Sequence, residues 1–292
     1  MMNFKRSKIR WSFLVFFIPV FLWLTLLFLL PNVELIRLSF IGTDYYGESG
    51  ATLGNYTVFF HEPIYWLTFT RTVGYSFVVT FVCLLIGLPV SFYITKVVGL
   101  RLKGLIMTLI LVPFWVSEIV RVYGMILLLR ETGIINRILV GIGIWKQPIE
   151  MLYNDVSMVM GIVYTATLFM IVPIVGVMDS LDDSLIEAAH DLGANKLIIW
   201  WKIILPHCMP GIMSGCIVVF MLVLGNYITP SLMGGKYSLW FTQQIYNQFI
   251  AYVNWNRGAA FGFLLLTISS LVIWAALKLT GQKLSRVSGV VK

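Results

Sequence analysis

The sequence predicts an all-α integral membrane protein, with six transmembrane helices in a single domain over residues 1–292. Of its residues 59% are hydrophobic and only 12% are charged, and the mean hydropathy is +0.89. A soluble surface cannot accommodate that composition. A helix needs about 20 apolar residues to cross the hydrocarbon core. Runs near that length cover residues 11–30, 72–95, 105–129, 157–178, 208–229 and 259–279.

The first of these spans follows a short basic segment that contains Lys5, Arg6, Lys8 and Arg10. A basic segment before an apolar run is also typical of a secretory signal peptide. Here the apolar run is too long, and no small-residue cleavage site follows it. We therefore expect a retained transmembrane helix.

Basic residues near the ends of the spans predict the orientation, because Lys and Arg concentrate in cytoplasmic loops. In a six-span protein the N-terminal cluster falls on one side of the membrane together with Lys96, Arg101, Lys103, Lys278, Lys283 and Arg286. Both termini are therefore expected in the cytoplasm. The net charge of +8 is spread along these membrane flanks, which favours contact with anionic lipid and not with nucleic acid.

Small and sulfur-containing residues inside the spans are expected to serve packing. Cys83, Cys208 and Cys216 lie in or beside spans without paired spacing, so neither a disulfide nor a metal site is indicated. Gly211 and Gly215 have the four-residue spacing that lets two membrane helices approach closely.

A polar break over residues 179–207 separates the fourth and fifth spans. Ser184 and Glu187 have the spacing of a capping box, which predicts a helix start. Gly193 stands where a helix would end in a left-handed residue. A second helical stretch over residues 195–205 is expected next, closed by Pro206 before the fifth span begins.

The first short helix of this break is predicted to be amphipathic. Its apolar stripe comprises Leu185, Ala188, Ala189 and Leu192, whereas Glu187, His190 and Asp191 point elsewhere. The two alanines would allow a groove of another protein to approach the backbone closely. The bland alternative is a capped surface helix without a partner.

Ionisable residues inside a span are costly and usually face a cavity or a partner. Glu118 and Arg121 lie three residues apart in the third span, where they would neutralise each other. They form either a structural ion pair or part of a solute pathway, with Trp115 and Tyr123 offering ring faces to a cation. In the fifth span, polar residues that would line a pore or a helix contact follow Gly225, namely Asn226 and Tyr227.

No motif indicates catalysis. The sequence contains neither HExxH nor GxSxG, and Gly234-Gly235-Lys236 is followed by Tyr237, so it lacks the phosphate-binding loop. An enzyme is therefore not expected. An ion-coupled secondary carrier would need further intramembrane carboxylates or repeated halves, and it would leave the polar break without a purpose.

The polar break resembles the EAA signature of the ATP-binding cassette (ABC) importer permeases of type I, which reads E-A-A, three residues, G, nine residues, I, one residue, L-P. The matching positions are Glu187, Ala188, Ala189, Gly193, Ile203, Leu205 and Pro206. Further stretches are similar to spermidine/putrescine permeases: residues 53–56, 112–115, 121–124 and 232–235.

The resemblance implies import of a small charged solute into the cytoplasm, with a polyamine such as spermidine or putrescine as the expected solute. An opine-like compound or another small solute is the alternative. The implied partners are two ATPase subunits that bind ATP and Mg, a second and non-identical permease, and an extracytoplasmic solute-binding protein. The implied location is a bacterial inner membrane. No cofactor is expected in this chain. The residues implied to contact the ATPase are Ser184, Glu187, Ala188, Ala189, Asp191 and Gly193.

Overall fold

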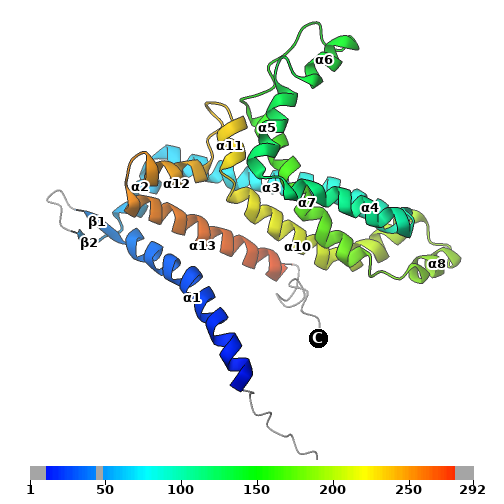
Figure 1. The fold of residues 1–292 in the computed structure, drawn as a ribbon, viewed down its shortest axis with the longest axis horizontal. Helices are drawn as coiled ribbons and strands as arrows, with labels where there is room; N and C mark the ends of the chain where they lie inside the picture. The colour runs from blue at the N-terminus through cyan, green and yellow to red at the C-terminus, as the bar shows by residue number, and fades with distance from the viewer. Residues whose placement is uncertain (1–10, 44–48, 280–292) are drawn as a thin grey trace, which may run out of the picture. The chain divides into compact units, whose positions relative to one another are not determined.

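The computed structural model describes residues 11–43 and 49–279 and is helical over most of them (Figure 1). The all-α prediction is confirmed, with one small addition. Two three-residue strands, β1 (Ile41–Thr43) and β2 (Ser49–Ala51), pair antiparallel with Gly42 opposite Gly50. The chain divides into two compact units, residues 1–63 with 245–267 and residues 64–244 with 268–292. The prediction of a single domain over residues 1–292 stays a prediction.

The helices follow one another along the chain with short connections. In order they are α1 (Trp11–Ser39), α2 (Gly54–His61), α3 (Pro63–Phe92), the π-helical turn η1 (Tyr93–Val97), α4 (Leu100–Leu111), the 3-10 turn η2 (Val112–Trp115), α5 (Glu118–Leu129), α6 (Ile134–Gly141), α7 (Asp155–Met178), α8 (Asp183–Asp191), α9 (Lys196–Ile199), the π-helical turn η3 (Trp200–Ile204), α10 (Leu205–Leu224), α11 (Ile228–Met233), α12 (Phe241–Ile250) and α13 (Trp255–Leu279).

Five helices in the described part of the chain are long and apolar enough to cross a membrane. They cover Phe17–Ser39, Pro63–Val97, Asp155–Met178, Lys196–Leu224 and Trp255–Lys278. A sixth candidate is a bent pair, Arg101–Trp115 followed by Glu118–Gly141, with an angle of 98° between its halves. The span expected over residues 105–129 is therefore divided, because the turn that contains Pro113 ends in extended backbone at Val116.

The first unit is built around the end of α1. Asn55 on α2 donates from Nδ2 to the carbonyls of Ser39 (3.0 Å) and Ile41 (2.9 Å), so that its amide ties α2 to the chain leaving α1. The ring of Phe59 meets that of Phe261 on α13 edge to face at 5.9 Å. The hydrogen bonds of the Asn55 side chain and the contact between two aromatic rings thus help to hold this unit together.

The second unit has its core where α7 and α10 run side by side (Figure 1). A Cβ at Gly211 would lie 2.7 Å from the carbonyl oxygen of Pro173, and one at Gly215 would lie 2.8 Å from the Met170 sulfur. A side chain at position 211 would meet the backbone of α7, and one at position 215 would displace the Met170 side chain. The packing prediction for the two glycines is therefore confirmed.

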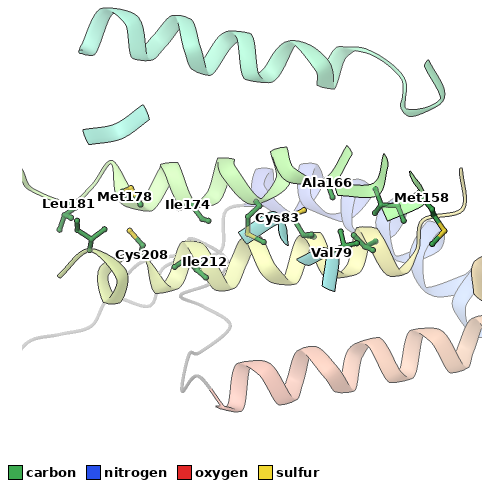
Figure 2. Close-up of a cluster of buried hydrophobic side chains, with 14 of the residues drawn as sticks. Val79, Cys83, Met158, Ala166, Ile174, Met178, Leu181, Cys208 and Ile212 are labelled. Carbon is green, nitrogen blue, oxygen red and sulfur yellow. The ribbon is translucent and has the colours of Figure 1, made fainter. Parts of the chain in front are cut away.

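Buried side chains from three helices meet in this core (Figure 2). Val79 and Cys83 come from α3, Ile174 is one of many from α7, and Cys208 and Ile212 come from α10. The three cysteines are free thiols, two of them buried and Cys216 half-buried. Their predicted role in packing is confirmed.

Candidate functional site

The polar break between α7 and α10 begins with α8, which starts earlier than the sequence predicts. Asp182 is the N-cap, and its Oδ1 accepts the backbone N–H of Ser184 at 3.0 Å. The predicted capping box at Ser184 and Glu187 is therefore wrong, because a carboxylate two residues upstream already satisfies the free amide. The bonds from Ser184 lower the pKa of the Asp182 carboxyl below its usual value.

The end of α8 has the predicted geometry. Gly193 has a φ of +78°, and its N–H donates to the His190 carbonyl at 2.9 Å. The N–H of Ala194 donates to the Ala189 carbonyl at 3.0 Å. These two bonds form a Schellman motif, in which the residue after the helix adopts a left-handed conformation. The predicted left-handed turn at Gly193 is confirmed.

The predicted apolar stripe of α8 is divided between two faces. Ala189 is half-buried and packs with Ile186 against the hydrophobic core. Leu185 (53% exposed) and Leu192 (88% exposed) lie on the outer face together with Ala188. The expectation that both alanines face a docking partner is therefore wrong for Ala189, since the helix presents its inner face to its own bundle.

The charged residues of α8 project into solvent. Ser184, Glu187, His190 and Asp191 are exposed. In the described part of the chain, no side-chain hydrogen bond or ion pair involves the carboxylates of Glu187 and Asp191. The outer surface of α8 thus combines exposed leucines with solvated carboxylates, which suits contact with another protein.

The second stretch of the break is continuous with the fifth span. The Asn195 side chain caps α9 by accepting from the Ile198 N–H at 2.8 Å, and α9, η3 and α10 then form one helical run from Lys196 to Leu224. The prediction that Pro206 closes this segment is wrong. Pro206 lies in the first turn of α10, just after the π-helical turn, where the absence of its N–H is tolerated.

A cavity of about 450 Å³ lies between α5, α7 and the break after α10. Four of the six residues predicted for a solute pathway line it: Glu118, Arg121, Asn226 and Tyr227. Apolar and small polar side chains complete the wall: Ile162, Thr165, Ala166, Phe169, Leu222, Val223, Gly225 and Ile228. The interruption of the helix after Leu224 therefore places polar groups beside the charged start of α5.

Glu118 is bound by residues far away in the sequence. Its Oε1 accepts from Asn226 Nδ2 at 2.8 Å and from Thr229 Oγ1 at 3.3 Å. No ion pair joins Glu118 to Arg121 within the described residues, so the predicted mutual neutralisation is wrong. The carboxylate turns toward the break after α10, which offers two donors.

Arg121 also lines a second, apolar cavity of about 570 Å³ that includes Pro113 and Met125. Its Nε and Nη1 are buried without a hydrogen-bond partner among the residues that the structure describes. Trp115 (91% exposed) and Tyr123 (51% exposed) do not line the first cavity. The structure thus brings Glu118 and Arg121 together with the helix interruption at Asn226. It does not bring the rings of Trp115 and Tyr123 to this cavity.

Two lysines that the sequence suggested only as markers of orientation bind the polar break. Lys96 in η1 contacts Leu181 and Asp183, and Lys103 in α4 contacts Asp179. In the sequence these lysines are marked only by their basic charge near the polar break, which contains more acidic than basic residues. That charge pattern does not specify which residues pair.

Comparison with known proteins gives consistent matches over most of the chain. A family model described as "Binding-protein-dependent transport system inner membrane component" matches residues 83–284. The spermidine/putrescine transport system permease protein PotB of Haemophilus influenzae is 34% identical over 258 residues, which is 87% of this chain and 89% of that protein. PotB of Escherichia coli strain K12 is 32% identical over 266 residues, 89% and 96% of the two chains.

A solved structure has a similar fold at low sequence identity. It is the crystal structure of a bacterial ABC transporter involved in the import of the acidic polysaccharide alginate. The TM-score is 0.73 at 16% identity, with 92% of this chain and 94% of that chain covered. This likeness supports the fold of an importer permease predicted from the sequence.

Proposed function

Because this chain belongs to the family of binding-protein-dependent transport system inner membrane components, we propose that it moves a polyamine such as spermidine or putrescine into the cytoplasm. It is a multi-pass inner membrane protein and a permease subunit of an ABC importer. The observation that carries the choice of solute is the identity of 32–34% to the two PotB proteins over nine-tenths of the chain.

The cavity beside α5 is lined by one carboxylate, Glu118, and one guanidinium, Arg121, and its carboxylate side supports binding of a cationic solute. A carboxylate inside a span is expensive to insert and is retained where it binds a partner or a solute. Glu118 accepts two hydrogen bonds through Oε1, and its side chain lines the cavity. At an effective dielectric of about 20, a cation roughly 8 Å from this charge gains about 2 kcal/mol. The Arg121 guanidinium, which lines the same cavity, opposes this attraction, so an amine held beside Glu118 is bound weakly enough to be released.

Energy enters through α8. The chain has no phosphate-binding loop, so ATP and Mg bind to a separate ATPase subunit. The outer face of α8 around Leu185, Glu187 and Leu192 is the contact surface, and Gly193 sets the turn that follows. With α8 contacting an ATPase, α8 and both termini lie in the cytoplasm in this proposal, as the basic residues that flank the spans predict.

The working assembly contains two such ATPases, a second and non-identical permease, and a solute-binding protein outside the membrane. ATP binding closes the ATPase pair, which moves α8 and the corresponding helix of the second permease. We call α8 the coupling helix. The permease pair then exchanges an outward opening for an inward one. Solute delivered from outside leaves toward the cytoplasm.

Reconstitution of the complete complex in lipid vesicles tests this proposal. ATP-dependent uptake of radiolabelled spermidine or putrescine is expected, and excess unlabelled polyamine is expected to suppress it. Glu118→Gln keeps an acceptor oxygen for Asn226 and removes the charge, so uptake at limiting solute should fall more than tenfold. ATP-dependent uptake of an opine-like compound in place of polyamines would reassign the solute, and uptake without ATP would indicate a secondary carrier.

A further inference from the structure

The coupling helix α8 is bound to a helix that is not its neighbour in sequence. Lys96 in η1, at the end of α3, donates from Nζ to the Leu181 carbonyl and to Asp183 Oδ1, both at 2.6 Å. Leu181 is buried in the core, and Asp183 is the first residue of α8. One ammonium group therefore holds both the chain that enters α8 and the first turn of the helix.

Lys96 is unlike an ordinary lysine at the end of a membrane helix. Such a side chain extends its charge toward water, but that of Lys96 is only 9% exposed. Its partner Asp183 is 72% exposed. The π-helical turn η1 ends α3 at this point, and turns of that kind are frequent at functional sites.

Two further contacts join the same segments. Lys103 on α4 donates to Asp179, just after α7. The ring of Phe92 at the end of α3 packs edge to face on that of Trp200 in η3, at 5.0 Å and 78°. The polar break is thus attached to α3 and α4 as well as to α7 and α10, with which it is continuous.

We propose that Lys96 is the positioning residue that makes α3 follow α8 when the ATPase moves the coupling helix. This inference rests on the proposed function and adds the route by which movement leaves α8. Displacing α8 without α3 would break both charge-assisted contacts of the Lys96 ammonium group, which is unfavourable. Displacing both together keeps the contacts. The Lys103–Asp179 pair joins α4 to the segment between α7 and α8.

The test measures solute uptake and ATP hydrolysis together in vesicles that contain the complete complex. Lys96→Met keeps most of the length and the apolar packing of this side chain and removes its charge. Asp183, left without its partner, is solvated. We expect ATP hydrolysis within about twofold of wild type, and at least a fivefold fall in spermidine taken up per ATP hydrolysed. Arg101→Met is the matched control, because Arg101 is an exposed basic residue at the start of α4 and should leave the ratio unchanged.

A double variant, Lys96→Met with Asp183→Asn, tests whether the two residues act through their contact with each other. Asp183→Asn leaves the Leu181 carbonyl in place, so a smaller fall of at least twofold is expected. Adding it to Lys96→Met should lower the ratio no further, since the contact is already lost. Lys96→Arg should restore part of the ratio. If Lys96→Met fails to assemble, Asp183→Asn decides alone, because an exposed aspartate is not needed for folding.

Three results would overturn the inference. One is a wild-type ratio in Lys96→Met, and another is a proportional fall of uptake and hydrolysis in a complex that still assembles. The third is an unchanged ratio in Asp183→Asn where Lys96→Met does not assemble. Wild-type vesicles test the proposed function separately. If they take up spermidine with ATP while Lys96→Met retains their ratio, the inference fails and the proposed function stands.

Discussion

The left-handed turn at Gly193 offers a sharp test of the coupling helix, because the substitution changes little except backbone conformation. Gly193 has a φ of +78°, and a Cβ built there meets no atom within 4 Å. Any loss of function on replacing it therefore arises from the backbone and not from a steric clash. The residue is exposed, so global stability should be unaffected.

The expected magnitude follows from two opposing contributions. A left-handed conformation costs a residue with a Cβ roughly 1–2 kcal/mol. The two Schellman bonds, at 2.9 and 3.0 Å, contribute about 0.5–1.5 kcal/mol each. With alanine at position 193, the formed turn and the frayed turn therefore have similar free energies. The end of α8 frays in a large fraction of molecules. Valine is less favourable still, whereas asparagine tolerates the left-handed region.

The assay is polyamine uptake per ATP hydrolysed by the reconstituted complex. We expect the ratio to fall in the order Gly193, Gly193→Asn, Gly193→Ala, Gly193→Val, with the thermal unfolding midpoint constant. Gly176→Ala is the control, because Gly176 is exposed inside α7 and a Cβ there also meets nothing within 4 Å. A wild-type ratio for Gly193→Val, or a lower ratio for asparagine than for alanine, would refute the reasoning.

Three further outcomes are expected. Glu118→Ala, unlike Glu118→Gln, leaves two donors unpaired at about 1–3 kcal/mol each, so the unfolding midpoint of the purified protein should fall only for alanine. The lowered pKa of Asp182 means that its cap is present above the usual carboxyl pKa and is lost as pH falls through the folded value. Protection of the α8 amides against exchange, relative to their intrinsic rates, should therefore decrease below about pH 4, and Asp182→Asn should abolish this dependence. Gly235→Ala places a Cβ 1.9 Å from the Tyr153 carbonyl oxygen and should destabilise the protein by at least about 1–3 kcal/mol, whereas Gly104→Ala, with open space around it, should not.

Features set by local chemistry could be predicted from the sequence. Gly193 follows an amphipathic stretch, and a helix that ends there needs a residue free to adopt positive φ. Gly211 and Gly215 occur one turn apart in an apolar run, a pattern with few uses other than close packing. In both cases the residues that decide the structure are neighbours in the chain.

The sequence predicts the structure less well where two nearby residues could play the same structural role. Ser184 and Asp182 are both good N-caps, and a pattern match favoured Ser184, although Asp182 makes the bond. Ala188 and Ala189 are adjacent, and one of them must face the bundle. Which one does so depends on the rotation of α8, which the contact of Ile186 with the core determines.

Charged residues within a span show most clearly why local spacing was insufficient. Glu118 and Arg121 are three residues apart, which predicts a pair, yet the carboxylate binds Asn226 instead. An ion pair at three-residue spacing on one helix stabilises the fold only slightly. The interruption after α10 leaves the Asn226 side chain inside the bundle, where its amide donor needs an acceptor. Lys96 is a second example, because its ammonium at the end of α3 binds the Leu181 carbonyl beyond the end of α7. In both cases the partner is created by an interruption of another helix, so the pairing becomes predictable only once that interruption is placed in space.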